Sequence, residues 1–207
     1  VTGYQWWWRF EYPELGVVTS NELHIPAGRR VILNLDSADV LHSFWVPRLA
    51  GKRDLIPNQN NQLWLVADEP GEYYGQCAEL CLGAHAYMKF RVIAESDAEF
   101  DAWVQAFTDV APQSVQADPQ IEQGRQLFAT KGCAGCHTID GYRANMRTGT
   151  PDFPNLTNFG MRTTLAAGVL PNTQENLERW LRDPQAIKPG NYMPQLWQAD
   201  APNADEE

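Results

Sequence analysis

The pattern of apolar and polar residues divides the chain into two parts. In residues 1–95 the two classes alternate over short segments such as 30–35 and 62–66, which is typical of half-buried strands. Turn-forming residues separate these segments, at positions 26–28, 47, 51, 57–58 and 70–71. Several short strands at this spacing favour a β-sandwich or a β-barrel.

Helical periodicity follows the predicted strands. Ser96 and Glu99 have the spacing of a capping box that opens a helix. We interpret residues 109–117 as a linker, because they are rich in Ala, Pro, Gln and Ser and show no apolar periodicity. The predicted domains are therefore 1–108 and 118–207.

The second domain is expected to be helical. Asp118 is a capping residue, and Pro119 suits the first position of a helix. The inner face of that helix is expected to be formed by Ile121, Gly124, Leu127 and Phe128. A further helix is predicted to open at Asn172 or Thr173 and to end before Pro184.

Composition indicates a folded, acidic protein. The 207 residues are 43% apolar and 20% charged, which is enough for two modest cores and excludes compositional disorder. The formal net charge of −10 argues against nucleic acid as a partner and allows a basic protein partner, although many proteins are acidic for solubility alone. No apolar run approaches the roughly 18 residues that span a bilayer, and no signal peptide is visible, so we expect this fragment to be soluble.

Residues 77–88 place two thiols, an imidazole and a thioether close together. Thiolates and thioethers are soft ligands that suit copper, and imidazole suits it too. Cys77 and Cys81 can bridge two copper ions. His85 can cap one of these ions, and the backbone carbonyl of Glu79 can reach the same ion weakly.

The second copper ion needs another histidine. His42 is the best candidate, with Met88 as a weak axial ligand, provided that the strands hold its loop against the motif. His24 has no companion ligands nearby, so we interpret it as a surface or strand histidine. On the residues alone, the tryptophans at 6–8 indicate aromatic packing on a strand.

Cys133, Cys136 and His137 form the C-x-x-C-H pattern of covalent haem c attachment. The cysteines would form thioethers to the haem, and His137 would bind its iron. All four cysteines of the chain thus accompany a histidine at ligand spacing, which disfavours the alternative of disulfides. Haem c is attached outside the cytoplasm, so we expect an extracytoplasmic location. Two redox sites on one chain favour an electron carrier.

Part of the chain is similar to a known family. Segments 41–43, 54–57 and 71–88 resemble subunit II of the haem–copper cytochrome oxidases, with similarity from about residue 5 to residue 107. The resemblance implies a cupredoxin-like Greek-key β-barrel that holds a dinuclear copper centre, Cu-A.

The same resemblance assigns roles to individual residues. It gives His42 and Met88 to one copper ion, and His85 with the Glu79 carbonyl to the other. It also implies that the Glu79 carboxylate helps to bind magnesium at the boundary with subunit I, a site that is incomplete without that subunit. Trp6 matches the aromatic residue that receives electrons from the donor.

The second part of the chain resembles the class I cytochromes c, which implies an all-α domain. Gly124 and Phe128 match the first helix of that family, and residues 154–156 match the segment that packs on the proximal side of the haem.

The axial methionine also follows from this resemblance. Residues 188–194 resemble the loop that presents it, which makes Met193 the sixth iron ligand. Ligation by His and Met raises the haem potential, as a donor to copper requires. Met146 and Met161 are weaker rivals because they lack the matching flank.

A subunit II domain followed by a cytochrome c domain resembles the caa-type oxidases. This implies the electron-entry subunit of a proton-translocating respiratory oxidase on the extracytoplasmic, periplasmic side of a bacterial cell membrane. Electrons would pass from an external cytochrome c or similar donor through haem c to Cu-A, and then to subunit I, which reduces oxygen. This chain would carry electron transfer only.

Other functions stay open. The main alternative is a free-standing electron carrier with the same cofactors and no oxidase. A copper-storage or metallochaperone module would need no haem. Nitrous oxide reduction also uses Cu-A but needs a second, His-rich domain, and this chain has only four histidines.

The chain departs from the family at both ends. The family has a two-helix membrane anchor before residue 5, and class I cytochromes c have a final helix after the axial methionine. Residues 203–206 have the form of a helix cap, so we expect the cytochrome domain to lack that last helix here.

Overall fold

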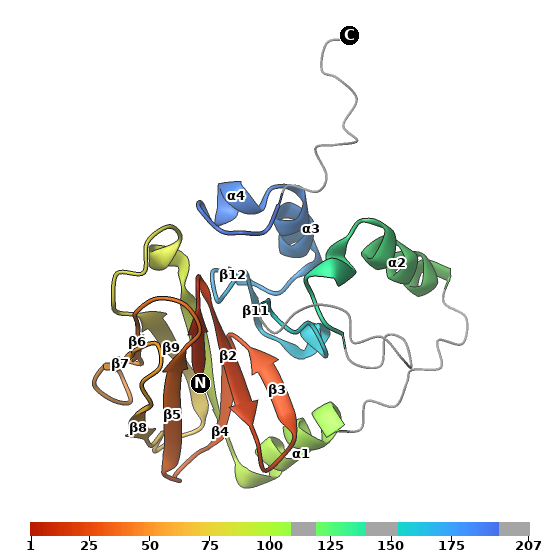
Figure 1. Ribbon diagram of the computed structural model, residues 1–207. Helices are drawn as coiled ribbons and strands as arrows, with labels where there is room; N and C mark the ends of the chain where they lie inside the picture. The colour runs from red at the N-terminus through yellow and green to blue at the C-terminus, as the bar shows by residue number, and fades with distance from the viewer. Residues whose placement is uncertain (109–118, 140–152, 195–207) are drawn as a thin grey trace, which may run out of the picture.

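The computed structural model describes residues 1–108, 119–139 and 153–194 (Figure 1). The predicted linker at 109–117, Met146 and the cap at 203–206 lie outside these ranges. The elements are β1 (Thr2–Tyr4), β2 (Trp7–Tyr12), β3 (Val17–Ser20), β4 (Glu22–Pro26), β5 (Val31–Ser37), β6 (His42–Trp45), β7 (Arg53–Leu55), β8 (Asn61–Leu65), β9 (Gly71–Cys77), η1 (His85–Tyr87), β10 (Lys89–Glu95), α1 (Asp97–Thr108), α2 (Pro119–Thr130), η2 (Cys133–Gly135), η3 (Phe159–Met161), β11 (Thr164–Leu165), β12 (Leu170–Pro171), α3 (Gln174–Arg182) and α4 (Pro184–Ile187).

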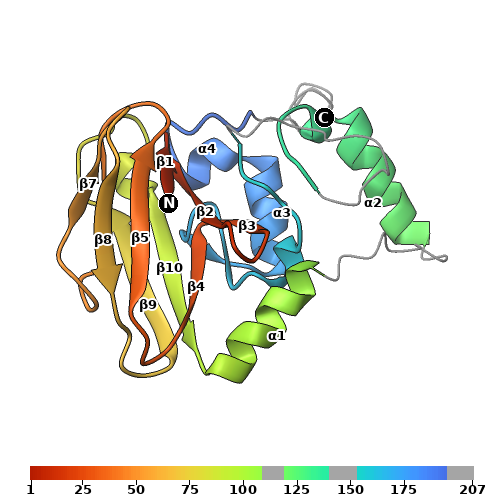
Figure 2. The same cartoon turned by 60° about the horizontal axis from the view of Figure 1, so that its bottom comes forward.

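Strands β1–β10 form two five-stranded sheets that face each other (Figures 1 and 2). One sheet has the order β3-β2-β1-β5-β8 and the other has β4-β10-β9-β6-β7. Most pairs are antiparallel, whereas β1 pairs with β5 and β4 pairs with β10 in parallel. The sequence predicted a β-sandwich or a β-barrel, and the structure has the two facing sheets of a sandwich.

Strand alternation explains which side chains fill the space between the sheets. In β9 the inward positions are Tyr73, Gly75 and Cys77, and the residues between them are exposed. Gly75 has to be glycine, because a Cβ atom there would lie 2.2 Å from the ring of Phe90. The apolar core continues up to Cys77, so the strand ends with a thiol facing inward.

Helix α1 closes one end of the sandwich. The Glu99 carboxylate accepts hydrogen bonds from the backbone and hydroxyl of Ser96, which confirms the capping box. Trp103 is buried on α1 and stacks on His24, with ring centroids 4.2 Å apart. Because His24 also contacts Glu95 at 3.0 Å, it is a buried strand histidine and the surface alternative is wrong.

The second part of the chain contains the predicted helices. Thr173 caps α3 by accepting a hydrogen bond from the backbone of Asn176, and α3 ends before Pro184 as expected. The described residues are not all helical, however, because β11 and β12 form a short antiparallel pair. This pair closes a turn over residues 166–169, where the backbone of Ala166 and Ala167 has positive φ.

The expected inner face of α2 is not buried. Ile121 is 52% exposed, Leu127 is 41% exposed and Gly124 is also exposed, while Phe128 is half-buried. Helices α3 and α4 lie beside the β-sandwich in both views, whereas α2 stands farther out (Figures 1 and 2). The amphipathic pattern thus predicted the helix correctly, but within the described ranges neither α3 nor α4 covers it. No helix in those ranges is long and apolar enough to cross a bilayer.

A buried carboxylate joins the second part of the chain to the sandwich. Glu22, at the start of β4, is 1% exposed. Its Oε1 accepts hydrogen bonds from the backbone and hydroxyl of Thr163, both at 3.0 Å, and from those of Thr164, at 2.8 and 2.7 Å. The burial of this charge is tolerated because several donors surround it.

Other contacts extend this interface. Arg91 of β10 donates to the Gly168 carbonyl at 3.0 Å, and Asn158 donates to the carbonyl of Ala106 at 3.0 Å. Residues 158–168 therefore pack on the strands and on the end of α1.

The Glu22 contact can be tested by substitution. Glu22→Gln should lower the free energy of unfolding by about 1–3 kcal/mol, because the amide cannot accept all the hydrogen bonds and leaves buried donors unpaired. Denaturant unfolding measures this loss, and amide hydrogen exchange should speed up at Thr163 and Thr164. Glu14→Gln is the control, since Glu14 is exposed in the turn after β2. Equal stability and equal exchange in the two variants would contradict the contact.

Candidate metal centres

The register of β6 against β9 brings the first two candidate ligands together. Phe44 of β6 pairs with Cys77 of β9. His42 lies two residues before Phe44, so it points to the same inner face. Its Nδ1 lies 3.9 Å from the sulfur of Cys77, and the His42 side chain is fully buried.

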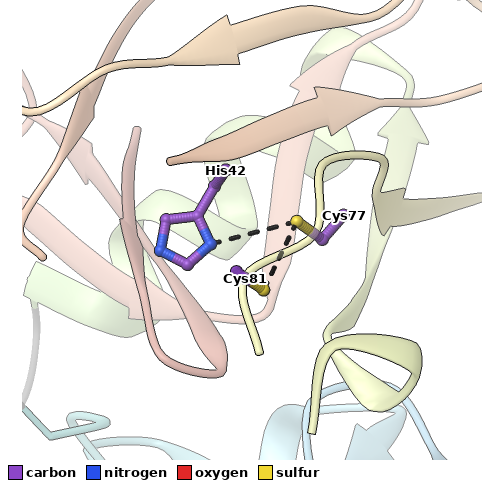
Figure 3. Close-up of side chains that lie close together, drawn as sticks. All are labelled: His42, Cys77 and Cys81. Carbon is purple, nitrogen blue, oxygen red and sulfur yellow. Dashed lines mark hydrogen bonds between the residues drawn. The ribbon is translucent and has the colours of Figure 1, made fainter. Parts of the chain in front are cut away.

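The loop after β9 returns the other candidates to the same place. The sulfur of Cys81 lies 3.9 Å from that of Cys77, 3.4 Å from Nδ1 of His85 and 3.8 Å from Sδ of Met88. The carbonyl oxygen of Glu79 lies 3.3 Å from the Cys77 sulfur. All six residues predicted as copper ligands therefore converge, and Figure 3 shows three of them, His42, Cys77 and Cys81, close together.

The donor set fits copper ions. Both cysteines are free, and their sulfurs can share a metal ion, because two sulfurs each about 2.3 Å from one ion can lie up to about 4.6 Å apart. Cys77, Cys81 and Met88 are buried, while His85 is half-buried. A buried cluster of thiolate, thioether and imidazole groups is suited to a soft ion such as copper.

Hydrogen bonds set the charge of this cluster. The contact with Cys81 lowers the pKa of Cys77 to about 3, and the same contact raises the pKa of Cys81. The two shifts have opposite directions because two adjacent negative charges repel each other, so one thiol ionises more readily than the other. Metal ions would displace a proton that remains on either thiol.

Asp39 is a functional candidate that the sequence analysis missed. Its Oδ1 accepts a hydrogen bond from Nε2 of His42 at 2.7 Å. Burial alone would lower the pKa of His42, but the bond to Asp39 raises it overall. The bond also leaves Nδ1 of His42 free to face the sulfurs, as expected for a histidine ligand whose other nitrogen is held by a carboxylate. The three-residue spacing from His42 was the available signal.

The Glu79 carboxylate takes part in its own loop. Its Oε1 accepts a hydrogen bond from the backbone of Leu80 at 3.1 Å. The residue is half-buried, so its carbonyl and its carboxylate face different partners.

Trp6 lies directly behind residues 78–88, the loop after β9 that carries most of the candidate copper ligands and is called the copper loop below. Its Nε1 donates to the carbonyl of Cys81 at 2.9 Å, and the side chain of Gln5 donates to the same oxygen at 2.9 Å. Trp6 is 7% exposed. Trp8, by contrast, is fully buried against Phe44 and Phe90 and is a core residue.

The C-x-x-C-H motif lies on the turn η2, which follows α2. Cys133 and Cys136 are free and half-buried. Nδ1 of His137 lies 2.8 Å from the carbonyl oxygen of Pro154, to which it can donate its proton. Burial lowers the pKa of His137, so the ring is neutral and its Nε2 is available to a metal. These residues fit a covalently attached haem.

The candidate axial methionine lies in an ordered segment after α4. The backbone N–H of Met193 donates to the side chain of Asn191 at 2.7 Å, and Gln185 donates to the Met193 carbonyl at 3.3 Å. Met161 is 47% exposed on η3.

A cavity of about 320 Å³ lies between the two parts of the chain. Its lining residues come from both parts: Tyr4, Gln5, Ala38, Asp39, Phe153 and Tyr192. Phe153 faces His137, with ring centroids 6.5 Å apart, and Tyr192 precedes Met193. The cavity therefore lies beside neighbours of both candidate iron ligands.

Known proteins resemble each part of the chain. Residues 16–96 match the family described as cytochrome C oxidase subunit II, periplasmic domain, and residues 121–205 match the cytochrome c family. The first family implies copper binding and the second implies haem binding.

The relatives align with nearly the whole chain. It is 47% identical over 194 residues to cytochrome c oxidase subunit 2 of Alkalihalophilus pseudofirmus, a match that covers 94% of this chain and 54% of that protein. It is 43% identical over 198 residues to the protein of the same name from Bacillus sp. strain PS3, covering 91% of this chain and 54% of that protein. The chain thus spans about half the length of the curated relatives it matches.

A solved structure matches the sandwich. The periplasmic domain of subunit II of cytochrome oxidase from Bradyrhizobium japonicum is 32% identical, with a TM-score of 0.50 over 52% of this chain and 89% of that chain. The copper-type loop, the haem motif and these relatives agree. The chain belongs to the cytochrome c oxidase subunit II family and carries the periplasmic domain of that subunit followed by a cytochrome c domain.

Proposed function

We propose that this chain is the electron-entry part of a respiratory haem–copper oxidase. It takes electrons from an external cytochrome c or similar donor at haem c, and delivers them to a dinuclear Cu-A centre that serves subunit I, where oxygen is reduced. The convergence of the six candidate copper ligands, on a face to which the cytochrome part is docked, carries this proposal.

In this proposal the sandwich holds the copper ions rigidly. Cys77 and Cys81 would be shared by the two ions, His42 and Met88 would hold one ion, and His85 with the Glu79 carbonyl would hold the other. The bound pair would supply a site that gains and loses one electron. Fixed ligands on strand ends and a short loop keep the reorganisation on electron transfer small, and burial keeps water out.

The cytochrome part holds haem c by Cys133 and Cys136. His137, whose ring proton the Pro154 carbonyl can hold, and Met193 would be the residues that hold the iron. The haem would supply a second one-electron site, whose potential is raised by the methionine. We assign residues 1–108 to a Greek-key copper domain, 109–117 to the linker and 118–207 to a class I cytochrome c domain.

The order of electron flow is supported by the position of Trp6. This residue is the proposed point of entry to copper, yet its side chain is 7% exposed. The ring of Tyr192 packs on it with centroids 4.7 Å apart. The cytochrome part of the same chain therefore covers the surface at which a diffusing donor would reach Trp6. Haem c is then the first acceptor of electrons from that donor.

Exposed apolar residues of the copper loop also support the proposal that a partner protein binds there. Leu80 and Leu82 are 71% and 64% exposed at its tip. Adjacent apolar side chains in water favour a protein surface against them, as expected for subunit I and not for a free-standing carrier. We place the Glu79 magnesium role at the same boundary. The family of the sandwich is a periplasmic domain, so the chain works on the extracytoplasmic side, and a membrane anchor would tether it there.

The dinuclear centre is tested by counting copper. The loaded protein should hold two copper ions per chain, with one unpaired electron shared between them when oxidised. Cys77→Ser and Cys81→Ser should each abolish the delocalised signal in electron paramagnetic resonance, because one bridge is lost. Elemental analysis that gives one copper per chain, or a localised Cu(II) signal in the native protein, would contradict the assignment.

The axial methionine is tested by optical spectroscopy. Met193→Ala should remove the far-red sulfur-to-iron absorption of the oxidised haem, because no thioether then reaches the iron. Met161→Ala is the matched control and should keep the band, since that side chain is 47% exposed on η3. Loss of the band in the control alone would move the ligand to Met161.

The relay is tested by rapid mixing with a reduced small cytochrome. The haem bands should change first and the copper absorption second, because Trp6 is covered. Cys77→Ser should leave haem reduction at its native rate while the copper phase disappears. Copper reduction that precedes haem reduction would contradict the proposed order of electron transfer from haem c to copper.

A further inference from the structure

Residues 188–192 make a dense contact with the back of the copper loop. Lys188 is 5% exposed, and its Nζ donates to the carbonyl of Trp6 at 2.5 Å. A Cβ atom on Gly190 would lie 3.3 Å from the backbone of Gly83, so the two segments approach closely. The Tyr192 hydroxyl donates to Oε1 of Gln5 at 3.1 Å.

The contact continues to a copper ligand. Trp6 and Gln5, which Tyr192 touches, both donate to the carbonyl oxygen of Cys81. On the other side, Tyr192 is the neighbour of Met193 in the chain and lines the cavity with Phe153. Tyr192 therefore lies between the segment of the candidate haem ligand and the ring behind Cys81.

We propose that Tyr192 is the bridge between the haem site and the copper site, and that the path runs from the Met193 segment through the rings of Tyr192 and Trp6 to Cys81. This proposal rests on the proposed function. Each transfer removes one electron from ferrous iron, which becomes ferric, and adds it to the oxidised copper pair, which becomes fully reduced. No bond forms, and both aromatic residues keep their protons.

The geometry explains why the ring is needed. Electronic coupling falls steeply across a gap, and two rings with centroids 4.7 Å apart leave no room for water between them. Tyr192 is 63% exposed overall, so its place is fixed by this ring contact and by the hydroxyl bond to Gln5. The ring provides the path, and its packing on Trp6 holds it in place even without the hydroxyl.

The test compares Tyr192→Phe with Tyr192→Leu in the full chain carrying both cofactors. After flash reduction of the haem by a photosensitiser, the rate of copper reduction should stay near native in Tyr192→Phe. It should fall by about an order of magnitude in Tyr192→Leu. Both redox potentials should be unchanged, so that the driving force is the same. Trp64→Leu, which removes an exposed aromatic ring from β8, is the control and should have no effect.

A second readout distinguishes an electron path through Tyr192 from a role of Tyr192 in holding the two parts of the chain together. Hydroxyl-radical labelling of Trp6 in the cofactor-free chain should be low in native protein and in Tyr192→Phe.

In Tyr192→Leu the slower transfer should remain independent of solvent viscosity, because the domains stay docked through Lys188 and Glu22. A rate in Tyr192→Leu equal to native, or one that becomes limited by viscosity, would overturn the role of Tyr192. Lack of either cofactor signal in native protein would overturn the proposed function, and this bridge with it.

Discussion

The pairing of β6 with β9 is the constraint on which the rest of the structure depends. It places His42 beside Cys77 at the inner end of two strands, where the core is already packed by Phe44 and Phe90. A shift of one residue in this register would turn the thiol to the outer face of the sheet. The loop of residues 78–88 can then close back on the same point with its remaining ligands.

The copper loop also serves as a docking surface. Gly83 in this loop has no side chain, so the ring of Trp6 can pack directly against its backbone. Residues 188–192 approach the same backbone through Gly190. The hydrogen bonds around Glu22 hold the other end of the same interface. Two buried polar side chains, Glu22 and Lys188, therefore fix the orientation of the second part of the chain, because each would be costly to bury without its partners.

Local sequence patterns predicted those parts of the fold and of the candidate sites whose residues lie close together in the chain. The candidate copper ligands after β9 and the haem motif are short-range signals, and the strands and helix caps follow from periodicity and side-chain chemistry. His42 required the family resemblance or a scaffold argument, since it lies 35 residues before Cys77. The roles of Glu22 and Tyr192 depend on tertiary contacts that no local pattern encodes, whereas Asp39 lies only three residues before His42. The amphipathic face of α2 predicts a helix but does not say what covers it.

The central claim is that the haem and copper sites are held in one fixed arrangement within a single chain. The most direct measurement is the distance distribution between ferric haem and the oxidised copper centre, obtained from their dipolar interaction in pulsed electron paramagnetic resonance. The account predicts one short, narrow distribution in the native protein. A broad distribution, or one centred at a distance that only a swinging domain could reach, would contradict it.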